Sequence, residues 1–186
     1  MKSIAYSLPC KQYGVVLIIS LVLLFTLTLI AVSSMGTSRL EQQMTANMRD
    51  RQIAFQAAET ALRDGERFVQ NTPLTAVNFD ASCSNGQCLC TSTMPSGCTT
   101  EYWTDTGLSV WTTAGKHKLY SGTKIGNQKA EYIVEYMGQS CDPATIAASA
   151  SGSCLASDPY MYRVTALGYG QTSAARVMLQ STYLKK

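Results

Sequence analysis

The segment VVLIISLVLLFTLTLIAV, residues 15–32, contains neither a charged side chain nor a proline in 18 positions. A helix of this length spans roughly 27 Å, close to the ~30 Å of bilayer hydrocarbon. Its only polar side chains, Ser20, Thr26 and Thr28, carry hydroxyls that can bond to a backbone carbonyl four residues earlier. The segment therefore predicts a membrane-spanning helix rather than the core helix of a soluble domain.

The helical pattern continues beyond this segment, because no proline occurs between Ser38 and Gln70. A stripe of apolar residues recurs there at helical spacing: Leu40, Met44, Met48, Phe55, Ala58, Leu62 and Val69. Pro73 is a typical stop signal. The sequence predicts one nearly continuous helix from residue 15 to about residue 70, roughly 84 Å long. Its first half is apolar on all sides, and we expect its amphipathic second half to pack on a domain.

Three fates are open for the apolar segment. Gly14 directly precedes it, and a glycine gives a protease an accessible backbone at the membrane edge. The run Ala31-Val32-Ser33 could instead serve as a signal-peptidase site, which would remove the segment. An uncut segment would remain as a plain membrane anchor.

The seven cysteines are divided by the apolar segment. Cys10 precedes it, and six follow it: Cys83, Cys88, Cys90, Cys98, Cys141 and Cys154. An even set beyond a membrane segment is typical of disulfides in an oxidising compartment, the periplasm in a bacterium. Basic residues flank the apolar segment on both sides, so the positive-inside rule does not decide its orientation.

The sequence favours one disulfide among the possible pairings. Cys141 and Cys154 flank a loop of small residues, and closing a loop of this length is worth about 3 kcal/mol in the chain-entropy model. The other four cysteines are expected to pair within residues 83–98. A structural zinc site is the alternative for these four, although an oxidising compartment disfavours free thiolates.

Strand patterns follow in the last third of the chain, at residues 130–136, 160–168 and 176–184. In the first of these, alternation places Tyr132 on one face and both Glu131 and Glu135 on the other. We expect the two glutamates to lie on a solvated face. The predicted fold is α+β, with an antiparallel sheet packed on the amphipathic half of the helix.

Composition argues against several classes of function. The chain has 46% hydrophobic and 15% charged residues, as a folded domain does. Its 15 basic residues include Lys2 and Lys11, so 13 basic and 12 acidic side chains follow residue 14. This near balance of charge does not indicate the basic surface that binds nucleic acid. His117 is the only histidine and is expected to be solvated, like Lys116, Lys118, Lys185 and Lys186. We therefore expect no catalytic site, metal or cofactor.

The run GVVLIISLVLLFTLTLIAVSSM followed by LEQQMTANMRDRQIAFQAAETALRDGE resembles the N-terminus of the PilX family of type IV pilus minor pilins. A weaker likeness extends to YRVTALGYG and VMLQSTYLKK near the C-terminus. The resemblance implies a type IV pilin-like fold with four parts. These are a leader peptide (1–14), the transmembrane or filament-core half of the helix (15–37), its amphipathic half (38–72) and a periplasmic α+β head (73–186).

The resemblance also implies how the chain is processed and where it acts. A prepilin peptidase cuts such chains after the glycine, here between Gly14 and Val15, and Val15 becomes the N-methylated N-terminus. By the same resemblance, the subunit is first anchored in the inner membrane with its head in the periplasm, and it then joins the extracellular pilus. The implied partners are other minor pilins and the major pilin, through the N-terminal helix, and a PilY-type tip adhesin. Lys11 departs from the family pattern, which often has a basic residue directly before the glycine.

Ile19 is the sharpest departure from most pilins, which carry a glutamate at the fifth mature position. A carboxylate inside the bilayer is costly unless it is paired, and in pilins it is thought to meet the N-terminal amine of the subunit added before it. A first-added subunit at the tip has no such partner, so Ile19 suits that position. The alternative is that Ile19 is tolerated in a weakly incorporated subunit. Gly36 stands where many major pilins have a helix-breaking proline.

The expected function is therefore a minor pilin that primes assembly at or near the pilus tip, in support of adhesion and twitching motility. A tip pseudopilin of a type II secretion system is an alternative of the same kind. A single-pass anchored periplasmic binding module and a Sec-processed secreted protein are alternatives of other kinds.

Overall fold

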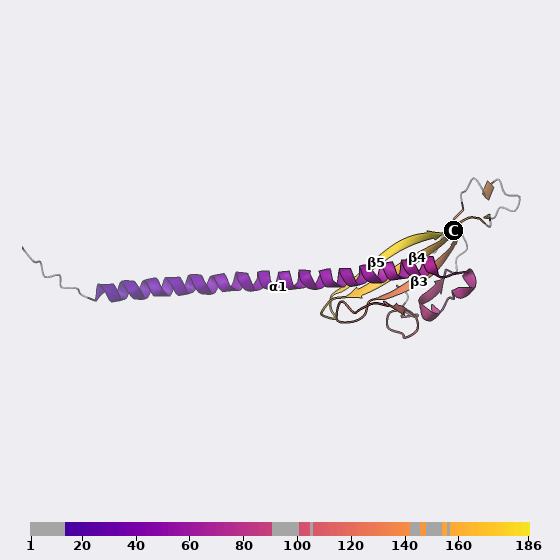
Figure 1. The fold of residues 1–186 in the computed structure, drawn as a ribbon. Coiled ribbons are helices and arrows are strands. Elements are labelled where there is room, and N and C mark those ends of the chain that lie inside the picture. The colour runs from indigo at the N-terminus through magenta and orange to yellow at the C-terminus, as the bar shows by residue number, and fades with distance from the viewer. Residues whose placement is uncertain (1–13, 91–100, 105, 142–145, 148–153, 156) are drawn as a thin grey trace, which may run out of the picture. The chain divides into compact units, whose positions relative to one another are not determined.

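The computed structural model describes residues 14–90, 101–104, 106–141, 146–147, 154–155 and 157–186, with the side chains of residues 34 and 35 left aside. It contains one long helix, α1 (Val15–Asn71), two short 3₁₀ turns, η1 (Ala76–Asn78) and η2 (Ser84–Gly86), and five strands (Figure 1). The strands are β1 (Gln87–Leu89), β2 (Lys118–Leu119), β3 (Glu131–Gln139), β4 (Tyr160–Tyr169) and β5 (Arg176–Lys185). The chain divides into two units, Met1–Ala46 and Asn47–Lys186, and we call the second unit the head.

Helix α1 is continuous over 57 residues, so the prediction of one helix from residue 15 to about 70 is confirmed. A lysine from the far end of the chain completes its last turn. The Nζ of Lys185 donates hydrogen bonds to the carbonyl oxygens of Val69 (2.7 Å) and Thr72 (2.6 Å). A cation at this end is favourable because the helix dipole and the unpaired carbonyls are both negative there. The expectation that Lys185 merely adds solubility is wrong.

The sheet is mixed, which corrects the expectation of a purely antiparallel sheet. Strands β3, β4 and β5 pair antiparallel, as the sequence predicted, but β1 pairs parallel to β3. The short β2 also pairs with β3. Residues of β1 match positions 134–136 and those of β2 match positions 131–132, so the two short strands lie in succession along one edge of β3.

The head packs α1 against the sheet through small residues. Four alanines of α1 are completely or almost completely buried: Ala54, Ala57, Ala58 and Ala61. Two of them share a core cluster with Tyr132 and Val134 of β3 and with Tyr162, Val164 and Ala166 of β4. Figure 1 shows the C-terminal part of α1 running alongside these strands. The α+β fold is confirmed, with an alanine face in the place of larger side chains.

The predicted apolar stripe is only partly buried. Leu40, Met44 and Met48 are each more than 60% exposed, and Phe55 is about half exposed. Burial instead begins at Ala54, shortly after Asp50 accepts hydrogen bonds from the Gln171 and Thr172 amides in the β4–β5 turn. The physical reason is that the sheet packs against the face of α1 that carries the small alanine side chains, because that face lets the helix come closest to the sheet.

A second core cluster covers the opposite face of β3. It contains the buried residues Cys83, Cys88, Tyr102, Val110 and Ile133, and the half-buried Trp103 and Trp111 pack against it. We call the described segments 83–90, 101–104 and 106–119, which supply this cover, the loop layer. The sheet is therefore enclosed on both faces at β3, by α1 on one face and by the loop layer on the other.

Gly168 allows the helix and β4 to approach closely. A Cβ at this position would overlap the backbone of Ala54 and Ala58, and backbone atoms of a packed helix cannot move aside cheaply. We expect Gly168→Ala to destabilise the head by about 1–3 kcal/mol through overpacking. The measurement is thermal unfolding of the detergent-solubilised full chain.

Gly36→Ala is the matched control, because nothing lies within 4 Å of a Cβ at Gly36. It should leave the unfolding of the head unchanged while favouring the helix locally. Equal unfolding temperatures for Gly168→Ala and the unmodified chain would contradict the role given to this close contact.

Candidate assembly site and the covered face of the head

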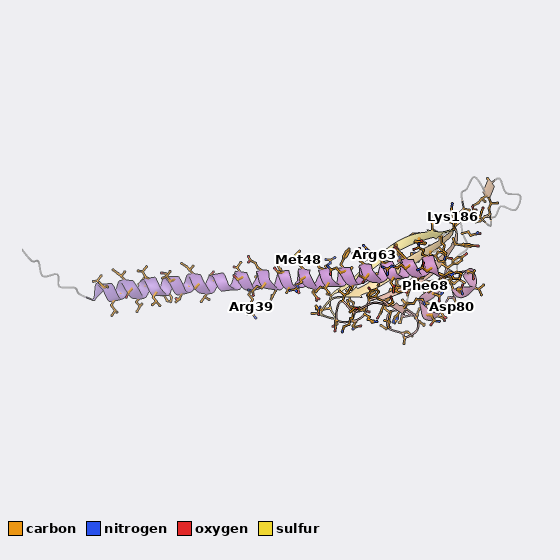
Figure 2. The ribbon with its side chains drawn as sticks, in the orientation of Figure 1. Arg39, Met48, Arg63, Phe68, Asp80 and Lys186 are labelled. Carbon is orange, nitrogen blue, oxygen red and sulfur yellow. A yellow bond between two sulfur atoms is a disulfide. The ribbon has the colours of Figure 1, made fainter. Side chains whose placement is uncertain are left out.

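The apolar half of α1 is the candidate assembly site. Every large apolar side chain from Val15 to Val32 is exposed by 53–69%. Figure 2 shows side chains projecting all round this part of the helix. Among the described residues, one helix is long and apolar enough to cross a membrane, and it is α1. Such a surface is stable only in lipid or against other apolar helices.

The three hydroxyls in this segment are satisfied within the helix. Ser20, Thr26 and Thr28 donate to carbonyl oxygens at 2.9, 2.9 and 2.7 Å. Each acceptor lies three residues earlier, not four as expected. Because no hydroxyl is left without an acceptor, the segment can enter lipid or a helix bundle without losing a hydrogen bond to water.

The predicted processing residues lie at the start of α1. Gly14 forms the turn before the helix, and its carbonyl accepts from the amides of Leu17 (3.1 Å) and Ile18 (3.4 Å). Val15 is the first helical residue, and Ile19 is exposed on the second turn. The structure thus places Gly14 in the turn directly before the first residue of α1. Cleavage, methylation and the role of Ile19 remain predictions.

The head is braced by disulfides. Cys83 pairs with Cys88, and Cys141 pairs with Cys154, the pair that the sequence favoured. Cys90 is also disulfide-bonded, whereas Cys98 lies outside the described residues. A zinc site built on Cys83, Cys88 and Cys90 is incompatible with these bonds, because zinc needs the free thiolates.

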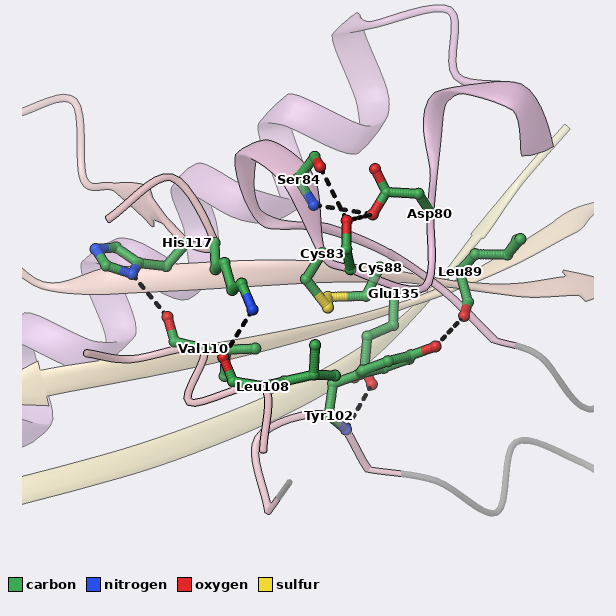
Figure 3. Close-up of a disulfide and its surroundings, with 12 residues drawn as sticks. Asp80, Cys83, Ser84, Cys88, Leu89, Tyr102, Leu108, Val110, His117 and Glu135 are labelled. Atoms are coloured by element: carbon green, nitrogen blue, oxygen red, sulfur yellow. Dashed lines mark hydrogen bonds between the residues drawn. A yellow bond between two sulfur atoms is a disulfide. The ribbon is translucent and has the colours of Figure 1, made fainter. Parts of the chain in front are cut away.

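Hydrogen bonds hold the loop layer around the Cys83–Cys88 disulfide (Figure 3). The carboxylate of Asp80 accepts from the Ser84 amide (3.0 Å) and the Ser82 hydroxyl (2.8 Å). These bonds, the Ser84 amide first, lower the pKa of Asp80. The hydroxyl of Tyr102 donates to the carbonyl of Leu89 across the layer.

Glu135 lies beneath the loop layer and is completely buried, so the expectation of a solvated glutamate face is wrong. Arg163 of β4 donates from Nε to Oε2 (2.7 Å) and from Nη2 to Oε1 (2.8 Å). The Tyr102 amide adds a longer bond to Oε1 at 3.5 Å. The hydrogen bonds that Arg163 donates to Glu135 raise the pKa of Arg163 further above its ordinary value. The alternation of β3 was predicted correctly, but the cover over that face was not.

Glu131 is also buried on this face, with 7% of its surface exposed. The Tyr169 hydroxyl donates to its Oε2 at 3.2 Å, and the Nε2 of His117 lies 3.9 Å from its Oε1. Burial raises the pKa of Glu131, against the opposing effect of His117. The Nδ1 of His117 lies 2.8 Å from the carbonyl of Val110, so His117 is not the solvated loop residue that the sequence predicted.

The two lysines beside His117 also make specific contacts, which corrects their expected role as solubilising charges. The Nζ of Lys116 donates to the carbonyl of Leu108 at 3.0 Å. The ammonium of Lys118 lies 4.3 Å from the centroid of the Phe68 ring, and burial lowers the pKa of Lys118. Lys116 thus holds two parts of the loop layer together, whereas Lys118 holds β2 against α1.

Two family models match this chain and together cover almost all of it. The model described as "PilX N-terminal" matches residues 14–63, and the model described as "Type IV pilus assembly protein PilX C-term" matches residues 68–185. The chain belongs to the PilX family of type IV pilus assembly proteins. No curated protein and no solved structure gives a significant match.

The match to the PilX family extends across the head. There the sequence pattern did not predict that Arg163 pairs with a buried glutamate. A single arginine within the otherwise uncharged strand YMYRVTALGY was the available signal, together with the glutamates in β3. Only the strand register, which places Glu135 opposite Arg163, shows that the two side chains meet.

We expect Arg163→Met to destabilise the PilX-type head by about 3–5 kcal/mol, because it leaves the buried carboxylate of Glu135 unpaired. The double variant Arg163→Met/Glu135→Met should regain much of this loss, since it buries no charge. Denaturant unfolding of the two single variants and the double variant measures the coupling. A loss below about 1 kcal/mol for Arg163→Met would contradict the structural role of the pair.

Proposed function

We propose that this chain is a minor pilin that primes assembly of the type IV pilus and is located at or near its tip. The supporting observation is the exposed, uncharged helix from Val15 to Val32, within a chain of the PilX family. Its action is one of packing rather than catalysis. The helix joins the helices of other minor pilins and of the major pilin, and the head stays outside that bundle.

The proposed pathway begins with the leader. A prepilin peptidase cuts between Gly14 and Val15 on the cytoplasmic side, and Val15 is N-methylated. The helix then holds the subunit in the bacterial inner membrane with the head in the periplasm. The disulfides of the head support that orientation, because they persist in oxidising compartments. Assembly moves the helix from lipid into the core of the filament, from one apolar environment to another.

Ile19 supports a position at the tip. A glutamate at this site would have to be neutralised in lipid and in the filament core. A subunit that is added first meets no earlier amine, so an apolar side chain avoids an unpaired charge. We propose that the tip complex contains the other minor pilins and a PilY-type adhesin, through which the chain supports adhesion and motility.

Three other functions share parts of this geometry. A tip pseudopilin of a type II secretion system would use the same cut at Gly14 and the same Ile19, and would be found with secretion components in place of pili. An anchored periplasmic binding module and a Sec-processed secreted protein would differ at the mature N-terminus.

The mature N-terminus is the first test. We expect mass spectrometry of the protein from its own cells to find N-methylated Val15. Gly14→Lys should block the cut and retain the full-length chain, whereas Gly36→Ala should not affect it. A mature chain that starts at Ser34 would show removal by signal peptidase, and a retained Met1 would show a plain anchor. Either result would overturn the proposal.

The charge at position 19 is the second test. Because a tip subunit has no earlier amine to meet, Ile19→Glu should give little or no gain in the amount of this chain in sheared pili. Ile18→Glu is the control for adding a carboxylate one residue away. Immunoblots of sheared pili and membranes provide the measurement. A large rise in filament content for Ile19→Glu alone would rule out the tip position.

A further inference from the structure

His117, the only histidine of the chain, connects the loop layer to strand β3. Its ring lies between two oxygen atoms. The carbonyl oxygen of Val110 lies 2.8 Å from Nδ1, and Oε1 of Glu131 lies 3.9 Å from Nε2. Figure 3 shows the contact with Val110. Because only 13% of the His117 side chain and 10% of the Glu131 side chain are exposed, solvent screens the two groups from each other weakly.

The contact with Val110 determines which nitrogen of the ring carries a hydrogen. A carbonyl oxygen can only accept a hydrogen bond, so Nδ1 is the donor. In a neutral ring, Nε2 then has a lone pair and no hydrogen, and that lone pair repels the carboxylate of Glu131. In a protonated ring, Nε2 carries a hydrogen and attracts the carboxylate. The contact between His117 and Glu131 is therefore favourable only while the pair holds a proton.

Two groups on the neighbouring strands also act on Glu131, and neither changes with pH near neutrality. The hydroxyl of Tyr169 in β4 donates to Oε2 at 3.2 Å. Burial, and after it the charge of Glu131, raises the pKa of Tyr169 to about 12, so this hydroxyl remains a donor. Arg176 of β5 lies over the Tyr169 ring, 5.8 Å from its centroid, and its permanent charge attracts the carboxylate.

The other charged side chains beside the pair have partners of their own. Glu135, two turns of the pleat further along β3, is paired with Arg163. On either side of His117, Lys116 donates to a carbonyl within the loop layer, and Lys118 lies over an aromatic ring of α1. His117 is thus the group on this face whose residue type changes charge near neutral pH.

The tryptophans of the loop layer leave it incompletely hydrogen-bonded. Trp103 and Trp111 pack against the second core cluster, but neither buried indole N–H has an acceptor among the described residues. A buried donor without an acceptor lowers the stability of the closed layer. Segments held in this way open more easily than a core whose polar groups are all paired. One contact such as that between His117 and Glu131 can therefore shift the opening equilibrium.

Two carboxylates at the loop layer have opposite effects on stability as the pH changes. Burial raises the pKa of Glu131 above its ordinary value of 4.5, so its contribution to stability is complete at acid pH and is lost as the pH rises. Hydrogen bonds, that from the Ser84 amide first, lower the pKa of Asp80 below 3.8, so its contribution is lost only as the pH falls through that lower value. A loosening of the layer on raising the pH through neutrality therefore belongs to Glu131 and His117, and not to Asp80.

We propose that the contact between His117 and Glu131 is a pH-dependent switch, which holds segment 106–119 on β3 while the pair carries a proton and releases it when that proton is lost. A rise in pH through neutrality loosens this segment, whereas the packing of α1 on the sheet is unchanged. The switch goes beyond the proposed function and does not depend on it, because every group involved belongs to the head.

Hydrogen exchange of the detergent-solubilised full chain, measured at about pH 5.5 and about pH 8.5 and corrected for intrinsic rates, tests the switch. We expect protection of the amides in 106–119 to fall by about tenfold at the higher pH, the change that a difference of one pKa unit between the closed and open states produces. Residues 54–61 of α1 should keep their protection. Both tryptophans of the chain lie in the loop layer, so acrylamide quenching of their fluorescence should rise in parallel. Equal protection of 106–119 at both pH values would overturn the proposal.

A pair of variants at neighbouring positions separates the switch from a general loosening of the layer. His117→Gln replaces the ring by an amide that does not titrate, so protection of 106–119 should become the same at both pH values. Lys116→Gln is the matched control, because it removes the bond to Leu108 and leaves the pair intact. It should lower protection equally at both pH values and keep the tenfold difference. A pH difference that persists in His117→Gln, or disappears in Lys116→Gln, would contradict the switch.

Nitrogen-15 NMR of the full chain labelled at histidine tests the same geometry without any substitution. His117 gives the only histidine signals when the purification tag contains none. At about pH 8.5 we expect a hydrogen on Nδ1 and none on Nε2. A hydrogen on Nε2 at that pH would overturn the proposal, because the ring would then donate toward Glu131 on both sides of neutrality.

Discussion

The close contact between helix α1 and strand β4 is the constraint on which the head depends. Gly168 and the buried alanines of α1 let the helix backbone lie almost directly on the sheet. Larger side chains of the sheet, such as Tyr132 and Tyr162, fill the space beside that contact. The helix is thereby fixed along the sheet. Lys185 fastens its C-terminal end to β5, and Asp50, within the helix, accepts hydrogen bonds from the β4–β5 turn. The part of α1 within residues 47–71 is thereby a packed part of the head.

The second constraint is the loop layer, which turns a half-exposed sheet into an enclosed one. It buries Glu135, and a buried carboxylate is tolerated only with a partner of opposite charge, which Arg163 provides. The Cys83–Cys88 disulfide and the bond from Tyr102 to Leu89 keep the layer closed over this pair. The head therefore resists opening without a large aliphatic core.

Much of the fold could be predicted because its signals are local. The continuous helix, the positions of β3, β4 and β5 and the alternation of side chains in β3 follow from spacing along the chain. The parallel pairing of β1, the burial of Glu135 and the function of Lys185 could not be predicted in this way. Each depends on contact between residues far apart in the sequence, and neither periodicity nor composition carries information about such contacts.

The sequence by itself determined an apolar helix without charges, the position of Gly14 before it and the absence of a carboxylate at Ile19. These are properties of consecutive residues, and they lie within the part of the chain that the PilX N-terminal family model matches. The tertiary structure decided which face of α1 is buried, which glutamates are paired and which edge of the sheet has no strand partner among the described residues. The physical reason is that burial and pairing are properties of surfaces, and a surface exists only after distant segments have come together.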